Sequence, residues 1–340
     1  MQLRPIEQQV VVVVGASSGI GRETALRFAR RGAKVVVAAR GEPGLRSLVD
    51  EIRRTGGEAT PVVADVTEFE QVKAIADRAV EAYGRIDTWV HLASVAVWGT
   101  FEQTTPAEFA RIIDVNLTGQ AYGAMAALPH LRREGRGALI HISSGEAKLS
   151  IPLQSAYTAS KHGMVGFLDA LRLELRHEGV PISVTNVMPA GINTPFFNKA
   201  RTKLGVRPRF APPIYQPSVV VDAILYAAEH PTRDIIVGGA AKLGILLQRI
   251  SPRLIDALLL RAAFRIQRSD EPKSEDAPHN LYEPIAGFDR VTGDFDAEAK
   301  SWSTYTWLAI HPTMRRAITS TGLGAVALLA LRVFRREDSV

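Results

Sequence analysis

The chain of 340 residues contains no cysteine. That absence excludes disulfides, thiolate nucleophiles and cysteine-ligated metals, and it suits a reducing compartment. The N-terminus also lacks a charged segment followed by an apolar stretch and a small-residue cleavage site, so we expect a cytoplasmic protein without a signal peptide. Hydrophobic residues make up 46% and charged residues 22% of the chain. This balance argues against bulk disorder and predicts a globular protein with a large core.

Short segments typical of strands alternate with helical segments as far as residue 241, and no solenoid-type repeat is visible. The expected strands cover residues 10–14, 33–40, 58–66, 86–94, 137–144, 181–189 and 233–239. The expected helices cover residues 20–31, 44–54, 68–83, 106–131, 155–178 and 217–229. The run of five valines at 10–14 indicates a strand buried on both faces. The alternation predicts an α/β fold, with a doubly wound, mostly parallel seven-stranded sheet of Rossmann type and an α-helical C-terminal extension.

The first expected strand runs into a glycine-rich turn, "VVVVGASSGIGRE", which places Gly15, Gly19 and Gly21 between a strand and a helix. Glycine allows close approach of the backbone to a phosphate, and a helix N-terminus offers N–H groups and the positive end of a dipole. The alternative is a plain tight turn. In the first strand-turn-helix unit of a doubly wound sheet, the pattern predicts a dinucleotide site.

A second motif, "SAYTASKHG", places Tyr157 and Lys161 four positions apart, on one face of the expected helix. A free phenol loses its proton near pH 10, and a neighbouring ammonium favours the phenolate. The tyrosine and lysine together therefore predict a general acid with a shifted pKa. An isolated tyrosine–lysine pair at this spacing usually lies on the surface without a catalytic role. Two serines, Ser143 and Ser144, end the preceding strand, and Asn116 lies in the helix before it.

The spacing GxxxGxG followed by YTASK resembles the short-chain dehydrogenase/reductase family, over about residues 8–240. The resemblance implies a catalytic tetrad in which a serine binds the substrate carbonyl, a tyrosine transfers the proton, and an asparagine holds a water that relays protons to the lysine. The matching residues are Asn116, Ser144, Tyr157 and Lys161, with Ser143 ranked behind Ser144. The resemblance also implies a nicotinamide nucleotide held by these residues: Gly15, Ser17, Ser18, Gly19, Ile20, Gly21, Asp65, Val66, Ala93, Tyr157, Lys161, Ile192 and Thr194.

The end of the second strand bears on the choice of nucleotide. An acidic residue there would bind the ribose diol and repel a 2′-phosphate. The segment ends instead in Arg40, whose guanidinium can donate two charge-assisted hydrogen bonds to a phosphate. We therefore expect NADP(H) rather than NAD(H). The alternative is that Arg40 only caps a strand at the surface. We expect no metal site.

Two segments depart from the family pattern. The family usually shows NNAG after the fourth strand, where this chain has "HLAS", residues 91–94, so the local hydrogen bonding must differ. The family also shows a glycine after proline where this chain has Ala190 after Pro189. Neither change touches the four catalytic positions.

Residues 194–217 lie where the family keeps its substrate loop, and they contain five large apolar side chains: Phe196, Phe197, Phe210, Ile214 and Tyr215. Trp98 and Phe101, after the fourth strand, are expected to line the same mouth. Apolar walls favour an apolar carbonyl or alcohol, such as a lipid-like molecule. The alternative, that these side chains only pack the lid, stays open.

The chain beyond residue 241 is divided by composition into three parts. Residues 242–268 combine a broad apolar face with Lys242 and five arginines against one acid, which predicts a basic amphipathic helix of the membrane-surface kind. Residues 269–300 carry nine acidic residues and read as a linker or a surface-wrapping loop. Residues 301–340 form an apolar and basic tail, whose uncharged stretch 317–331 is short for a membrane span and is flanked by arginines. Packing on the core or in an oligomer is the alternative.

These observations predict an NADP(H)-dependent oxidoreductase that interconverts a carbonyl and a secondary alcohol on an apolar substrate. The chain is expected to form a homo-oligomer and to associate with membranes through its C-terminal region. A non-catalytic NADP-binding regulator at a membrane is the alternative from another class. The net charge of +6 could also attract nucleic acid, but the basic residues lie among aliphatic ones without stacking aromatics, so we expect no nucleic-acid partner.

Overall fold

The computed structural model describes residues 1–317 of the chain. The uncharged stretch expected at 317–331 therefore lies, apart from its first residue, outside the described residues. Seven parallel strands form one sheet in the order β10-β7-β6-β4-β1-β2-β3. Their bounds are β1 Val10–Val14, β2 Lys34–Ala39, β3 Glu58–Val63, β4 Thr88–His91, β6 Gly137–Ile142, β7 Ile182–Pro189 and β10 Asp234–Val237. The predicted seven-stranded, doubly wound sheet is confirmed.

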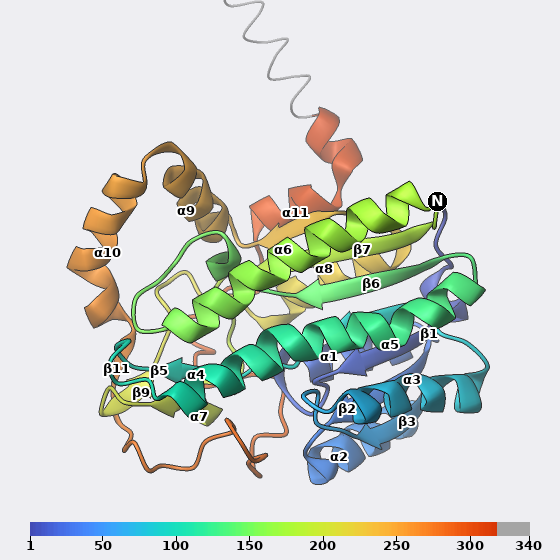
Figure 1. Ribbon diagram of the computed structural model, residues 1–340, viewed down its shortest axis with the longest axis horizontal. Helices are drawn as coiled ribbons and strands as arrows, with labels where there is room; N and C mark the ends of the chain where they lie inside the picture. Colours follow the sequence, from blue (N-terminus) through green and yellow to red (C-terminus); the bar gives the residue numbers. More distant parts are fainter. Residues whose placement is uncertain (318–340) are drawn as a thin grey trace, which may run out of the picture.

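Helices cover both faces of the sheet (Figure 1). One face packs against α1 (Gly19–Arg30), α2 (Glu42–Arg54) and α8 (Pro217–Glu229). The other packs against α3 (Phe69–Tyr83), α4 (Pro106–Ile113), α5 (Gly119–Arg133) and α6 (Ser155–His177). The helix expected at 106–131 is interrupted by a π-helical turn at Asp114–Thr118.

The valines of β1 show why this sequence builds a two-faced core. Val11 and Val13 belong to the cluster under α1, α2 and α8, and Val12 and Val14 to the cluster under α3, α5 and α6. Successive side chains of a strand point to opposite faces, so a central strand needs apolar residues at every position. Burial of each valine stabilises the fold by about 1.5–3 kcal/mol.

Because all seven strands are parallel, the segments that follow them meet at one edge of the sheet. The glycine-rich turn follows β1, residues 92–94 follow β4, the two serines follow β6, and residues 190–194 follow β7. The strand order reverses between β1 and β4, and ligands of open α/β sheets bind outside the carboxyl ends of strands at such a point.

The C-terminal part of the chain begins with two helices, where we had predicted one. They are α9 (Gly239–Ile250) and α10 (Pro252–Ile266), and the break falls at Ser251. Pro252 has no N–H to continue the first helix and starts the second instead. A short helix, α11 (Thr304–Ile310), follows later and contacts β10, α8 and α9.

Residues 268–300 run along the surface beside the carboxyl edge of the sheet. They start with β11 (Arg268–Pro272), which pairs antiparallel with β9 (Val206–Pro208). They end where Phe295 and Asp296 bond to the side chain of Asn193. A second small pairing joins β5 (Val97–Trp98) to β8 (Arg201–Thr202). Within residues 1–317, none of the helices combines the length and the apolar character that a membrane span requires.

Candidate active site

A cavity of about 230 Å³ opens at the carboxyl edge of the sheet and extends between the glycine-rich turn, the substrate loop and residues 280–289. Every residue predicted to bind the cofactor lines it, and so do Ser144 and the phenylalanines Phe196, Phe197 and Phe210, whereas Asn116 does not. The apolar walls and the few convergent polar groups are typical of a small-molecule site.

The glycine-rich turn has the geometry that a nucleotide cradle requires. Gly15 has φ +89°, and a Cβ there would lie 2.7 Å from the backbone nitrogen of Ala93. A Cβ on Gly21 would lie 2.1 Å from the carbonyl oxygen of Gly15. Helix α1 also begins without a side-chain cap. The N–H of Gly19 donates to the carbonyl of Arg290, so the N–H groups of Ile20 and Gly21 are the ones left for an anion. The residues present therefore fit the diphosphate of a nicotinamide nucleotide.

The tyrosine and lysine of the second motif lie on α6 and both face this cavity. Tyr157 is 7% exposed and Lys161 is 1% exposed. The Lys161 ammonium lies 5.3 Å from the centre of the Tyr157 ring. It donates a hydrogen bond to the carbonyl of Ile142, at the end of β6, at 3.2 Å. The spacing in sequence thus places a phenol and an ammonium at one point of the site.

Burial changes the proton affinities of this pair in a direction that the sequence did not predict. Desolvation, and then the charge of Glu146, raise the pKa of Tyr157 above its ordinary value, while interaction with the Ser144 hydroxyl opposes them. Desolvation also lowers the pKa of Lys161 from 10.5 to about 7. The expectation that Lys161 makes the phenol acidic near neutrality is therefore wrong for this site, because desolvation of the buried phenol outweighs the opposing hydrogen bond from Ser144.

The two serines after β6 have different partners. The Ser143 hydroxyl donates its proton to Asn186 Oδ1, in β7, at 2.5 Å. That proton is therefore used within the sheet. The Ser144 hydroxyl accepts from the backbone N–H of Glu146 at 3.1 Å and keeps its own proton for a partner in the cavity. This difference favours Ser144, as ranked from the sequence.

Asn116 lies behind the cavity, inside the π-helical turn, and is fully buried. Its Oδ1 accepts from the backbone N–H of Val95 at 2.8 Å, and its Nδ2 donates to the carbonyl of Val95 at 2.9 Å and to Ser160 Oγ at 3.2 Å. The side chain thus fixes the segment after β4 against α6.

Arg40 reaches the cavity but is held by a distant part of the chain. Its two terminal nitrogens each donate at 2.6 Å, one to the carbonyl of Tyr282 and one to that of Asn280. The guanidinium also lies 3.9 Å from Asp65, whose other partner is Arg111 at 2.7 Å. Arg40 therefore ties residues 280–282 to the end of β2 in addition to facing the site.

Residues 280–289 form one wall of the cavity, which sequence reasoning missed. The carbonyl of Arg290 accepts from the backbone N–H of Gly19 at 2.9 Å, and Asp289 lies against Gly44 of α2. Lys199, at the end of α7 (Phe196–Lys199), also lines the cavity, and its ammonium donates to Ser18 Oγ at 2.6 Å. No spacing or periodicity in the sequence predicts these contacts.

The departure "HLAS" places a histidine in the apolar interior. His91 is fully buried, and among the described residues its ring nitrogens have no hydrogen-bond partner. Desolvation holds its pKa well below the usual range, so the ring is neutral. Nearby, Gln120 Nε2 donates a hydrogen bond to the carbonyl of Ala93 at 3.3 Å, and Gln120 Oε1 lies 2.8 Å from His141 Nδ1. Gln120 thus links the segment after β4 to β6 beside the site.

The aromatic residues of the substrate loop separate into two groups. Phe196, Phe197 and Phe210 line the cavity, and Trp98 packs edge-on against Phe196 with ring centres 5.8 Å apart. Ile214 and Tyr215 are buried in the core instead. The expectation for Phe101 is wrong: its side chain is 70% exposed, because it follows β5 onto the outer surface.

Comparison with known proteins agrees with this geometry. The family model for short chain dehydrogenases matches residues 9–205. A relative from Bacillus subtilis (strain 168), the uncharacterized oxidoreductase YxnA, is 37% identical over 335 residues, which cover 98% of this chain and 93% of the relative.

Two solved structures have the same fold. A short chain dehydrogenase/reductase from Burkholderia phymatum in complex with NAD is 26% identical, with a TM-score of 0.67 over 74% of this chain and 96% of that one. An alcohol dehydrogenase from the archaeon Thermococcus sibiricus, complexed with 5-hydroxy-NADP, is 22% identical, with a TM-score of 0.59 over 67% of this chain and 95% of that one. The chain belongs to the short-chain dehydrogenase/reductase family and is an oxidoreductase that acts on CH–OH groups with NAD(P).

Proposed function

We propose that this protein uses NADP(H) to interconvert a carbonyl and a secondary alcohol on an apolar substrate, with Tyr157 as general acid and base. The observation that carries the proposal is that Ser144, Tyr157 and Lys161 line one cavity with the glycine-rich turn. A non-catalytic nucleotide-binding regulator would not need a phenol, a hydroxyl and an ammonium together there. The division into a catalytic domain at 1–241 and three C-terminal segments is part of the same proposal.

In the reducing direction, the Ser144 hydroxyl donates a hydrogen bond to the carbonyl oxygen and Tyr157 gives that oxygen its proton. A raised pKa keeps the phenol protonated until an alkoxide, which is a far stronger base, develops. The Lys161 ammonium then stabilises the phenolate, because negative charge that forms beside it favours the protonated form of the lysine. Asn116 positions the loop after β4 and supports proton resupply to Lys161.

The nucleotide would be held by the glycine-rich turn at its diphosphate, by Asp65 and Val66 at its adenine, and by Ala93, Ile192 and Thr194 at its nicotinamide. When bound, it supplies or accepts the hydride. Lys161 also orients the nicotinamide ribose in this proposal. All of these residues line the cavity.

The preference for NADP(H) rests on Arg40, which faces the cavity from the end of β2. The segment that ends β2 carries no acidic residue in sequence, although the Asp65 carboxylate lies 3.9 Å from the Arg40 guanidinium. The experiment is thermal unfolding of the purified protein with NADPH, NADH, NADP⁺ or NAD⁺, which requires no knowledge of the substrate. A ligand at about 100 times its dissociation constant should stabilise by about 2.7 kcal/mol. We expect larger shifts with the phosphorylated nucleotides, and a loss of that preference in Arg40→Asp. Shifts only with NADH or NAD⁺ would overturn the preference and keep the enzyme.

The substrate proposal rests on the phenylalanines that line the cavity. A panel of ketones and aldehydes of increasing apolar size tests it. Turnover is measured from the absorbance of the reduced nicotinamide. We expect KM to fall as apolar size rises, since each buried CH₂ contributes about 0.8 kcal/mol. A preference for small polar carbonyls would contradict the proposal.

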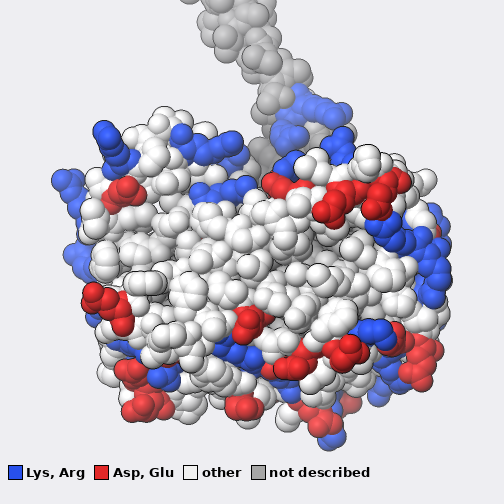
Figure 2. All heavy atoms as spheres, in the orientation of Figure 1, with Lys and Arg blue, Asp and Glu red and all other residues white. Residues whose placement is uncertain are grey.

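Two surfaces support proposals for partners. An uncharged face lies over α5 and α6 (Figure 2), where Met125 is 55% and Leu173 is 66% exposed. We expect homo-oligomers to form through this face. Sedimentation of wild type and Leu173→Asp tests this, because a variant that assembles like wild type would contradict it.

Helices α9 and α10 expose a second surface, where arginines border large apolar side chains, among them Leu254, Leu258 and Leu260 (Figure 2). This combination suits an anionic membrane surface. We expect the protein to co-sediment with anionic vesicles and not with zwitterionic ones or with DNA, and Leu260→Glu to weaken the association. Equal binding of wild type and variant would overturn the proposal.

A further inference from the structure

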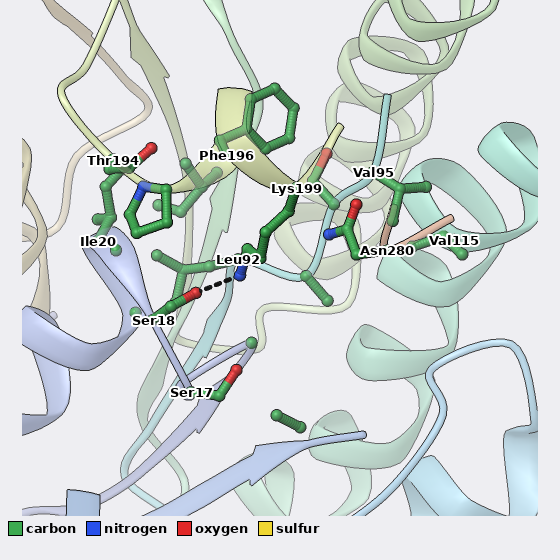
Figure 3. A pocket seen from close by; sticks show the side chains of 18 of the residues that line it. Ser17, Ser18, Ile20, Leu92, Val95, Val115, Thr194, Phe196, Lys199 and Asn280 are labelled. Carbon is green, nitrogen blue, oxygen red and sulfur yellow. Dashed lines mark hydrogen bonds between the residues drawn. The ribbon is translucent and has the colours of Figure 1, made fainter. Parts of the chain in front are cut away.

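Lys199 is a cation of the cavity that the family resemblance did not assign to any role. It is the last residue of α7, in the substrate loop, yet its side chain points away from the substrate side and toward the glycine-rich turn (Figure 3). Its ammonium donates to Ser18 Oγ at 2.6 Å. Ser18 is the residue that immediately precedes α1, so the charge lies at the N-terminus of that helix.

The electrostatic surroundings of this ammonium favour an incoming anion. Within residues 1–317, no carboxylate forms an ion pair with it, although Asp289 lines the same cavity. Desolvation, opposed by the charge of Asp289 and aided by the smaller influence of Arg40, lowers the pKa of Lys199 from 10.5 to about 8. The N-terminus of α1 adds a positive dipole end. An anion beside this desolvated ammonium would stabilise its charge.

The backbone of Lys199 is held in place from two sides. Its carbonyl oxygen accepts from the backbone N–H of Asn280 at 2.9 Å, in the segment that walls the cavity. Two residues earlier, Phe197 is fixed in an aromatic cluster and is 1% exposed. The ammonium therefore reaches the glycine-rich turn from a backbone that is already ordered, which reduces the entropic cost of binding.

We propose that Lys199 binds the diphosphate of the nucleotide cofactor, from a part of the substrate loop that is already ordered. The location beside Ser18 favours the diphosphate over the 2′-phosphate, because Arg40 stands at the other end of the adenosine half. The inference rests on the proposed function, through its nucleotide. Since Phe196 begins the same short helix and lines the cavity, α7 contributes both to the diphosphate site and to one wall of the substrate pocket.

The rival interpretation is that Lys199 is only a structural tie between α7 and the glycine-rich turn. The experiment compares the dissociation constants of two probes by calorimetry: ADP-ribose, which has the diphosphate but no nicotinamide, and adenosine 2′-phosphate, which has no diphosphate. The variants are Lys199→Met, which keeps the length without the charge, and Lys199→Arg, which keeps the charge. Lys73→Met, on the exposed face of α3, is the control for the loss of one positive charge.

We expect Lys199→Met to weaken ADP-ribose binding at least about tenfold and adenosine 2′-phosphate binding less than about threefold, with Lys199→Arg close to wild type. Unfolding without ligand should be unchanged, which a structural tie would not allow. Unchanged ADP-ribose affinity in Lys199→Met, or equal losses for both probes, would overturn the inference and leave the proposed function intact. Wild-type protein that binds neither ADP-ribose nor NADPH would overturn both.

A second experiment measures the protons taken up on ligand binding rather than the affinity. An anion beside Lys199 raises its pKa from about 8 toward the ordinary value, so ADP-ribose binding near pH 8 should take up about half a proton. Calorimetry in buffers of different ionisation enthalpy measures this uptake. We expect it in wild type and in Lys73→Met, and we expect Lys199→Met to lose it. Uptake that persists in Lys199→Met would contradict the assignment.

Discussion

Replacement of Glu146 by glutamine should remove a pH-dependent loss of stability that is built into the active site. Glu146 is 2% exposed. One of its oxygens accepts from Thr158 Oγ1 at 2.9 Å, and the other has no partner among the described residues. Desolvation raises its pKa from 4.5 to about 8, although Thr158 and the Lys161 charge oppose the rise. The folded protein thus keeps a proton that the unfolded chain releases.

The direction and the size of this pH dependence follow from the linkage between protonation of Glu146 and folding. Between pH 4.5 and about 8 the folded state binds more protons at Glu146 than the unfolded state, so its contribution to stability falls as pH rises. Lys161 acts in the opposite sense above about pH 7, where the unfolded chain holds the extra proton. The cleanest window is therefore from pH 4.5 to 7. One pKa unit corresponds to about 1.4 kcal/mol, so the loss across that window is about 3 kcal/mol.

The assay is urea unfolding followed by circular dichroism near pH 5, 6 and 7. We expect the stability of Glu146→Gln relative to wild type to rise by about 3 kcal/mol across these conditions. The exposed residue Glu70, changed to glutamine, is the control and should follow wild type. Parallel curves for wild type and Glu146→Gln would refute the argument, because they would mean that Glu146 ionises alike in both states.

Three further outcomes test the packing around the site. Gly21→Ala places a Cβ 2.1 Å from the Gly15 carbonyl, so we expect the turn to shift and NADPH affinity, measured by calorimetry, to fall at least about tenfold. Trp89→Ala empties a fully buried position of the sheet and should cost about 3–5 kcal/mol in urea unfolding. Arg40→Ala removes both bonds to the carbonyls of residues 280 and 282, so limited proteolysis should cut that segment faster than in wild type; equal rates would show that other contacts hold it.

Much of the fold could be predicted because its signals are local. The valines of β1, the glycines of the turn that follows, and the period of each helix are all read within a window of about 15 residues. The carboxyl edge follows from parallel strands alone, so the meeting of Gly15, Ser144 and Tyr157 at one cavity was predictable from their places in the order of elements.

The cavity wall at 280–289 could not be predicted, because its contacts join segments far apart with no shared pattern. Lys199 meets Ser18 across 181 positions and Arg40 meets Asn280 across 240. The error on the proton affinity of Tyr157 has a related cause. Spacing in sequence gives the neighbour of the phenol, but the extent of its desolvation depends on everything that packs around it.

The measurement that tests the account most directly is the comparison of wild type with Tyr157→Phe in two assays, NADPH binding and NADPH-dependent reduction of the best carbonyl from the panel. The variant removes one oxygen and the proton that it carries. The account predicts a dissociation constant within about threefold of wild type and turnover lower by about 10²–10⁴-fold. Turnover close to wild type with intact NADPH binding would contradict Tyr157 as the general acid.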